Sequence, residues 1–198
     1  MVDPHSRQRP LPEAEYLELE SASPVKHEYV AGEIYAMSGV TTRHNLIAGN
    51  IYTHLRAAAR KGPCRVYVSD VKLRVTDAYY YPDVMVECTP GASPSLFIEM
   101  PCLLVEVTSP TTALVDRREK LVAYRRIPSL QAYLLVEQDR RHVTRHGRDT
   151  NGEWGFTVIT ERGLVGVPSP QCELSLDVIY EDVTMPPIGV AEQAEALT

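Results

Sequence analysis

The sequence lacks the features that mark membrane and repeat proteins. No apolar run approaches the roughly 18 residues needed to span a bilayer, and residues 1–10 are polar where a signal peptide would be apolar. Neither an internal repeat nor a low-complexity block is present. We therefore expect a protein of the cytoplasm with no membrane partner.

Basic charge and closely spaced cysteines are also scarce. The net charge is −6, which argues against a protein that coats nucleic acid nonspecifically, because such a protein needs a broad basic face. The cysteines are too scattered to suggest a zinc knuckle or a redox pair, and we expect them to be small buried hydrophobic residues. They are Cys64, Cys88, Cys102 and Cys172.

The composition that remains is typical of a globular domain. The fractions of hydrophobic residues, 44%, and charged residues, 23%, are near the averages of such proteins. At 198 residues the chain is long enough for one hydrophobic core and short for two. We predict a single domain over residues 1–198, with flexible tails at 1–10 and 185–198.

The first part of the chain predicts a helix, a β-hairpin and a second helix. Residues 12–20 have the early proline and the acidic first turn of a short helix. The alternating segment 27–37 indicates a hairpin around its glycine, which permits a positive φ. Thr41 or Thr42 can cap the helix that follows, and Gly62 ends it.

The middle of the chain contains strand candidates rich in branched and aromatic residues. Three of them follow one another as a meander, at 64–75, 79–88 and 103–107. Residues 89–101 are turn-rich and can form a loop over a site. The segment 108–127 has Ser/Thr-Pro start signals and then a helical pattern.

The last part of the chain predicts a further strand and a hairpin. Residues 132–138 are apolar enough for a central strand, and the segment 141–160 indicates a hairpin around Asn151 and Gly152. The order of elements predicts an α/β (α+β) fold, with a mixed β-sheet covered by helices and extra β-hairpins on the N- and C-terminal sides.

Asp83 and Glu106 are acidic residues inside apolar strand candidates. Asp83 follows a proline, and Glu106 interrupts a run of Leu and Val. An unpaired charge in such a strand would be costly. If the two strands are neighbours, their carboxylates and a nearby carbonyl, that of Val107, offer the hard oxygen ligands that Mg²⁺ prefers. The alternative is that each acid forms an ion pair with an arginine or a lysine.

Lys120 is the third charged residue of interest. It lies four residues after Asp116 and four before Tyr124, so the three side chains share one helical face. That face also carries small and apolar residues, which suggests that the ammonium points at the sheet. The alternative is a surface ion pair with Asp116.

Several motifs together resemble the Uma2 (Uma-two) family of bacterial restriction-endonuclease-like proteins. They are the proline-aspartate of YYYPDV, the glutamate of LLVEVTSP, the segment DRREKLVAYRRIPSLQAYLLV and the leading HEYVAGEIYAMSG. The resemblance covers residues 12–184, nearly the whole chain. The ordered set of motifs makes it specific.

The resemblance implies the fold and site of the PD-(D/E)xK nuclease superfamily. Such a fold has a central four-stranded mixed sheet flanked by helices, and Asp83 and Glu106 would be its acidic pair. The lysine expected two residues after Glu106 is replaced by Thr108. The resemblance therefore implies that Lys120 has taken over the role of that lysine.

Other residues are secondary candidates for the site. Glu33 is an additional acid of the kind that the superfamily recruits, or a solvated strand residue. His44 follows a helix cap and can approach a phosphate, and Tyr124 shares a helical face with Lys120. Asp70 and Lys72 form a literal DxK string, but it precedes the proline-aspartate, so we interpret them as supporting or edge-strand residues.

Arg117, Arg118 and Arg125 are basic residues that could contact a nucleic-acid backbone, although many such runs are solvated faces.

The hypothesis is a metal-dependent endonuclease that hydrolyses phosphodiester bonds of DNA, with no organic cofactor. Asp83, Glu106, Glu33 and the Val107 carbonyl would hold Mg²⁺ or Mn²⁺, and a homodimer would cut both strands. One rival is an inactive nuclease-fold module for nucleic-acid binding or assembly. The other is an oligomerisation domain whose acids form structural ion pairs.

Overall fold

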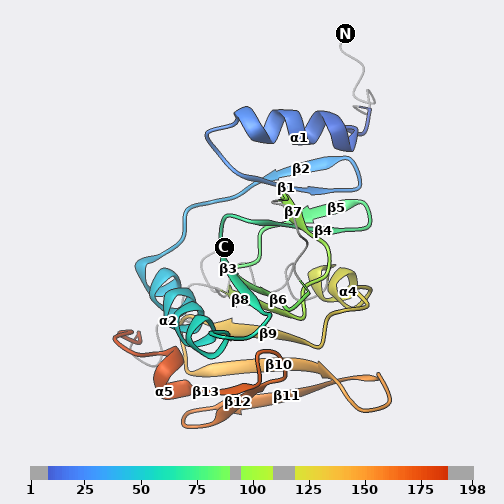
Figure 1. Ribbon diagram of the computed structural model, residues 1–198. Helices are drawn as coiled ribbons and strands as arrows, with labels where there is room; N and C mark the ends of the chain where they lie inside the picture. The colour runs from blue at the N-terminus through green and yellow to red at the C-terminus, as the bar shows by residue number, and fades with distance from the viewer. Residues whose placement is uncertain (1–8, 90–94, 109–118, 187–198) are drawn as a thin grey trace.

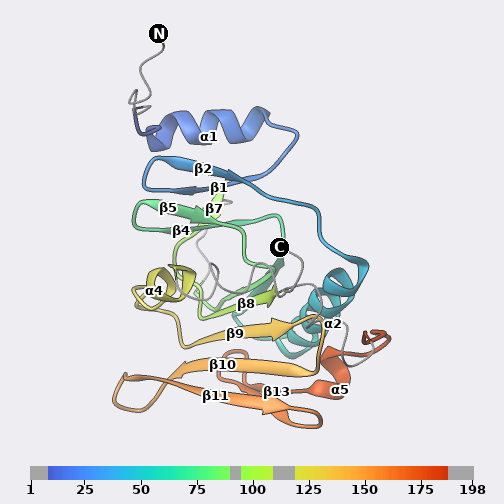
Figure 2. The ribbon, with the colours of Figure 1, turned by 180° about the vertical axis from the view of Figure 1, so that it is seen from behind.

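The computed structural model describes residues 9–89, 95–108 and 119–186. The described strands form a five-stranded sheet, a six-stranded sheet and a two-stranded hairpin. The five-stranded sheet lies above the six-stranded sheet in Figures 1 and 2, and the hairpin lies at the level of β10 and β11. The predicted mixed sheet with helices is present, but it has a second sheet beside it.

The six-stranded sheet carries the two acids predicted to form the site. In spatial order it consists of β11 (Trp154–Thr160), β10 (His142–Arg148), β9 (Ala132–Glu137), β8 (Leu103–Thr108), β6 (Val84–Glu87) and β3 (Arg65–Val68). β8 and β9 run parallel, whereas β6 pairs antiparallel with β8 and with β3. β9 is therefore a central strand, as its apolar composition predicted.

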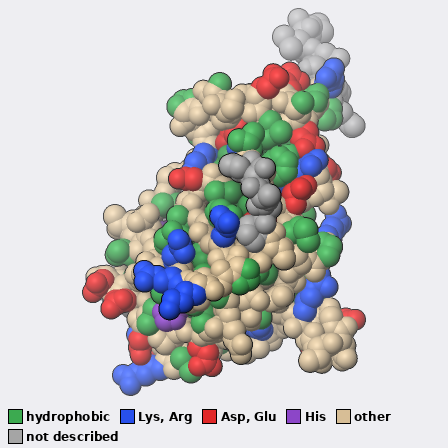
Figure 3. Space-filling model, viewed as in Figure 1, with side chains coloured by type: hydrophobic (Ala, Val, Ile, Leu, Met, Phe, Trp, Pro, Cys, Tyr) green, Lys and Arg blue, Asp and Glu red, His purple; other side chains and the backbone are tan. Residues whose placement is uncertain are grey.

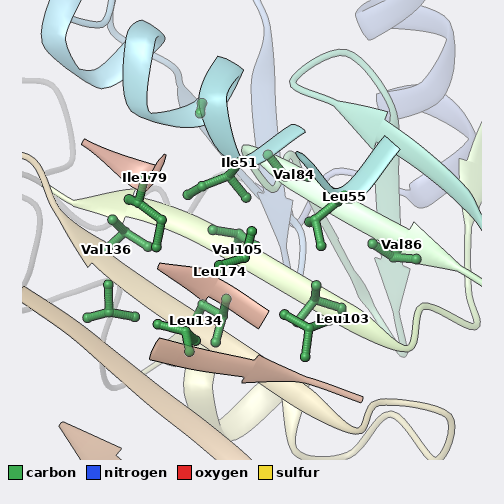
Figure 4. Close-up of a cluster of buried hydrophobic side chains, with 14 of the residues drawn as sticks. Ile51, Leu55, Val84, Val86, Leu103, Val105, Leu134, Val136, Leu174 and Ile179 are labelled. Carbon is green, nitrogen blue, oxygen red and sulfur yellow. The ribbon is translucent and has the colours of Figure 1, made fainter. Parts of the chain in front are cut away.

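One face of this sheet is covered by α2 (Thr42–Ala58). Ile47, Ile51 and Leu55 recur at helical spacing and are fully buried. Figure 4 shows Ile51 and Leu55 directed toward the sheet residues of the core, which include Val84 and Val105. This packing fixes the helix against β6 and β8.

The second sheet lies beneath the N-terminal helix α1 (Glu13–Ala22). In spatial order it consists of β2 (Glu33–Ala36), β1 (His27–Val30), β5 (Ala78–Tyr80), β4 (Lys72–Val75) and β7 (Phe97–Ile98). The Tyr16 ring of α1 stacks on Tyr29 with a centroid separation of 4.8 Å. The predicted hairpin is confirmed, and its turn residues Ala31 and Gly32 both have positive φ.

Two predicted strands each divide between the sheets, so the prediction of one continuous meander is wrong. The run 64–75 becomes β3 and β4, and the run 79–88 becomes β5 and β6. Ser69, at the first break, has φ of +53°, and Pro82, at the second, lacks the N–H that a strand ladder needs. The chain therefore crosses from one sheet to the other at Asp83.

Several other elements differ from prediction. β7 lies in the segment predicted as a loop. The hairpin of β12 (Leu164–Val167) and β13 (Cys172–Ser175), and the short helix α5 (Leu176–Ile179), were not predicted. Of the predicted helix at 108–127, the described part contains α4 (Leu121–Tyr124).

The prediction that all four cysteines are separate hydrophobic residues is wrong for two of them. Cys64 and Cys88 form a disulfide. They extend the antiparallel register of β3 and β6, in which Arg65 lies opposite Glu87. Cysteines 24 residues apart in sequence thus become cross-strand neighbours. Cys102 and Cys172 are free thiols, and Cys102 is buried.

The molecular surface mixes charges of both signs. On the face shown in Figure 3, basic and acidic side chains are interspersed. None of the helices within the described ranges is long and apolar enough to cross a membrane.

Candidate functional site

Asp83 and Glu106 lie on neighbouring strands, as predicted. Val84 lies opposite Val105 in the antiparallel pairing of β6 and β8. Continued by one pair, the same register places Asp83 opposite Glu106. Asp83 itself directly precedes β6, at the point where the chain enters the six-stranded sheet.

The Asp83 carboxylate is held by β8 and by the start of α2. Its Oδ2 accepts a hydrogen bond from the Val107 N–H at 2.7 Å. The same oxygen lies 3.2 Å from His44 Nε2. Thr41 caps α2 by accepting a hydrogen bond from the His44 N–H, which places the imidazole in the first turn of the helix. His44 therefore belongs to the site.

Glu106 is buried, with 6% of its surface exposed. Its Oε1 accepts a hydrogen bond from the Tyr124 hydroxyl at 2.9 Å and lies 3.5 Å from Lys120 Nζ. Burial, and then the charge of Glu106, raises the pKa of Tyr124 well above its ordinary value. The hydroxyl therefore keeps its proton and acts as a donor.

Lys120 points toward the sheets, as predicted from its helical face. Its side chain is only 9% exposed, and its Nζ lies 2.9 Å from Glu28 Oε1. The ammonium also lies 5.7 Å from the centre of the Tyr80 ring. Lys120 thus joins an acid of the five-stranded sheet to Glu106 of the six-stranded sheet.

Glu28 is the acid that sequence reasoning missed. It lies on β1 and also accepts a hydrogen bond from the Tyr81 N–H at 3.2 Å. A signal was present in the hairpin, because residues two apart on a strand share a face. Val30 packs against the core cluster that contains Leu104, and Glu28 shares the face of Val30.

Glu33 lies elsewhere on the hairpin. Its carboxylate accepts a hydrogen bond from the Tyr35 hydroxyl at 2.7 Å, and both side chains are exposed. Glu33 lines a hollow that also contains Glu119 and Arg126. The described contacts do not join it to Asp83 or Glu106.

The DxK string lies beside the site rather than in it. Asp70 is exposed and pairs with Lys26. Lys72 Nζ lies 5.5 Å from the centre of the Tyr81 ring. The interpretation of Asp70 and Lys72 as supporting residues agrees with these contacts.

Arg117 and Arg118, and with them Asp116, lie outside the described residues. Arg125 is described, and its guanidinium lies 5.7 Å from the centre of the Trp154 ring. Thr108, at the position where a lysine was expected, is buried in β8.

Carboxylates from both sheets gather at the described cationic groups. Glu28 and Glu106 face the ammonium of Lys120, and Asp83 faces the imidazole of His44. The described residues contain no preformed group of three His, Cys, Asp or Glu ligands. Mg²⁺ does not require one, since it is usually bound by one or two carboxylates together with waters and phosphate oxygens.

Comparisons with known proteins identify the family to which the chain is similar. A model of the Uma2 family, described as a putative restriction endonuclease, matches residues 13–178. The uncharacterized protein slr1290 of Synechocystis is 35% identical over 182 residues, covering 89% of this chain and 96% of its own. The uncharacterized protein sll1609 of the same organism is 32% identical over 149 residues. This match covers 73% of the present chain and 84% of sll1609.

A solved structure shares the fold. The crystal structure of a putative nuclease belonging to DUF820, from Anabaena variabilis, superposes with a TM-score of 0.73. The match covers 86% of this chain and 98% of that chain at 18% sequence identity.

Proposed function

We propose that this chain, which belongs to the Uma2 family of putative restriction endonucleases, is a metal-dependent endonuclease. It would hydrolyse phosphodiester bonds of DNA. The choice of DNA rests on the description of the family. The chemistry rests on the side chains at the junction of the two sheets.

The observation that carries the proposal is the placement of Asp83 opposite Glu106 across the pairing of β6 and β8. Glu106 is buried and Asp83 is mostly buried. Two neighbouring carboxylates in such a place offer the oxygen ligands that Mg²⁺ prefers. Asp83 and Glu106, with the Val107 carbonyl, would hold the ion, while Glu28 pairs with Lys120.

The described side chains would have distinct roles in this reaction. A bound Mg²⁺ or Mn²⁺ would activate a water molecule and neutralise negative charge on the phosphate. The Lys120 ammonium would stabilise negative charge that develops on the phosphate. His44 and the Val107 N–H orient Asp83, and Tyr124 orients Glu106.

A plasmid-cleavage assay tests this proposal. The pure protein should nick or linearise supercoiled DNA with Mg²⁺ or Mn²⁺ and should stop when EDTA is added. Asp83→Asn and Lys120→Ala should each reduce the rate by at least about 100-fold, as removal of a charge-stabilising group does in other enzymes.

The matched control is Glu33→Gln, which removes an exposed carboxylate of the hairpin. It should cleave at the wild-type rate, and circular dichroism should show that all variants are folded. Metal-independent cleavage, or full activity of Asp83→Asn, would contradict the proposal.

The second candidate is an inactive nuclease-fold module that binds nucleic acid or forms assemblies. Thr108 favours it, because the superfamily lysine is absent from that position. This alternative would be supported if the protein bound DNA but did not cleave it with Mg²⁺ or Mn²⁺, and if Lys120→Ala left the binding unchanged.

A further inference from the structure

A hollow opens beside Asp83 and His44. Its volume is about 370 Å³, and both side chains lie on its wall. The link from β2 to α2 forms another part of the wall through Met37 and Val40. Whatever occupies this hollow is therefore held next to the acid of the proposed nuclease site.

The rim of the hollow is apolar and exposed. Val40 is 58% exposed and Met37 is 36% exposed, and Val25 faces the same space. Tyr81 also lines the hollow but is buried, with 4% of its surface exposed. Apolar walls with a few polar groups are typical of pockets that bind small flat ligands.

Hydrogen-bonding groups and cations accompany these apolar side chains. Asn45 and Ser69 line the hollow, and both are exposed. Lys26 also lines it, with a side chain that is 43% exposed. Lys26 Nζ and Lys72 Nζ each lie 5.5 Å from the centre of the Tyr81 ring. The Lys26 pairing with Asp70 is at the surface, where such pairs contribute little, so the ammonium can turn to a phosphate.

A larger hollow on the hairpin side is lined mainly by acids among its charged residues. It is lined by Glu33, Asp77 and Glu119, together with Arg126. Excess negative charge there would repel phosphates. The chemistry of a nucleotide therefore fits the hollow beside Asp83 better.

We propose that the hollow beside Asp83 receives one unpaired nucleobase. This inference rests on the proposed function, and it names the substrate class as single-stranded DNA or a nucleotide turned out of a duplex. A base inside a duplex is stacked on both faces and cannot enter a side pocket. An unpaired base can pack against the apolar rim of Met37 and Val40 while lysines contact the flanking phosphates.

Binding in EDTA, measured by fluorescence anisotropy, separates this inference from catalysis. The probes are one labelled oligonucleotide as a single strand, the same strand fully paired, and a duplex in which one base is left unpaired. The wild type should bind the single strand at least about tenfold more tightly than the paired duplex, because bases stacked inside the duplex cannot reach the apolar rim.

The double variant Met37→Asn/Val40→Asn should lose that preference, because neutral polar side chains weaken stacking without adding charge. Its matched control is Val158→Asn/Leu164→Asn, which changes two exposed apolar residues of β11 and β12. These strands lie at the opposite end of the molecule from α1 (Figure 1), and the control should bind as the wild type does.

Equal affinity for the single strand and the paired duplex would overturn the inference, as would unchanged single-strand binding by the Met37/Val40 variant. Tighter binding of the duplex with one unpaired base than of the paired duplex would support extrusion of a base. A protein that shows the predicted binding but cleaves nothing with Mg²⁺ or Mn²⁺ would refute the nuclease and leave the nucleobase site intact.

Discussion

Glu106 is positioned by two groups from the segment that follows β8. The Tyr124 hydroxyl donates to its Oε1, and Lys120 Nζ lies 3.5 Å from the same atom. Tyr124 is fully buried, so its hydroxyl has no easy access to water. We infer that Tyr124 is a positioning residue, which acts on the reaction through the Glu106 carboxylate.

Tyr124→Phe should fold but lose this hydrogen bond to a charged group, which typically contributes about 1.5–3 kcal/mol. We expect kcat for DNA cleavage to fall about tenfold or more with little change in KM, and the free energy of unfolding to fall within that range. Steady-state kinetics and urea denaturation measure the two effects.

The control is Tyr35→Phe, which removes another tyrosine–carboxylate hydrogen bond, between the exposed residues Tyr35 and Glu33. Tyr35→Phe should change neither kcat for DNA cleavage nor the free energy of unfolding. If Tyr124→Phe behaved like this control, Tyr124 would have no part in positioning Glu106.

The site could be predicted residue by residue where a charge interrupts an apolar pattern. Asp83, Glu106 and Lys120 were found in this way, and the structure brings them to one junction of the fold. Glu28 was missed because β1 is short and its neighbour Tyr29, not Glu28, carries the obvious core signal. Tertiary packing decides which face of β1 is turned toward the other sheet, and this cannot be predicted from the local sequence.

At the level of elements, strand composition predicted where extended segments occur but not where they change sheets. β3 and β4 come from one run of strand-forming residues, and the break between them lies at Ser69 to Val71. A single residue with positive φ is enough to redirect the chain. The pairing partners then decide the sheet to which each half belongs, since β3 pairs with β6 whereas β4 pairs with β5 and β7.

The disulfide between β3 and β6 leads to a prediction about stability. Cys64→Ser/Cys88→Ser should lower the free energy of unfolding by about 3 kcal/mol, as expected for a bond that closes a loop of this size. Both cysteines are replaced because Cys102 Sγ lies 3.2 Å from Cys88 Sγ and could pair with it in a single variant. Urea denaturation without reductant measures the change.

Cys172→Ser removes a free thiol and should leave stability nearly unchanged. Mass spectrometry of non-reduced peptides should recover Cys64 joined to Cys88. Free thiols at both positions in oxidised protein would contradict this pairing. Since such bonds open in reducing surroundings, reductant should bring the wild type to the stability of the double variant.

For the molecule as a whole, the two sheets meet where the site lies. Asp83 and Glu106 belong to the six-stranded sheet, Glu28 belongs to the five-stranded sheet, and Lys120 contacts an acid of each. The sequence predicted the mixed sheet and its covering helix, but not the second sheet, because its strands are short and come from three separate segments, 27–36, 72–80 and 97–98. We further propose that a homodimer presents two such sites to the two strands of a duplex.

The central claim is that Asp83 and Glu106 together hold a divalent cation, and calorimetric titration with Mn²⁺ tests it most directly. We predict saturable binding by the wild type, loss of that binding in Asp83→Asn and in Glu106→Gln, and wild-type binding in Glu33→Gln, whose carboxylate lies on the exposed hairpin. Absence of binding in the wild type, or binding by Asp83→Asn and Glu106→Gln that equals that of the wild type, would contradict the claim.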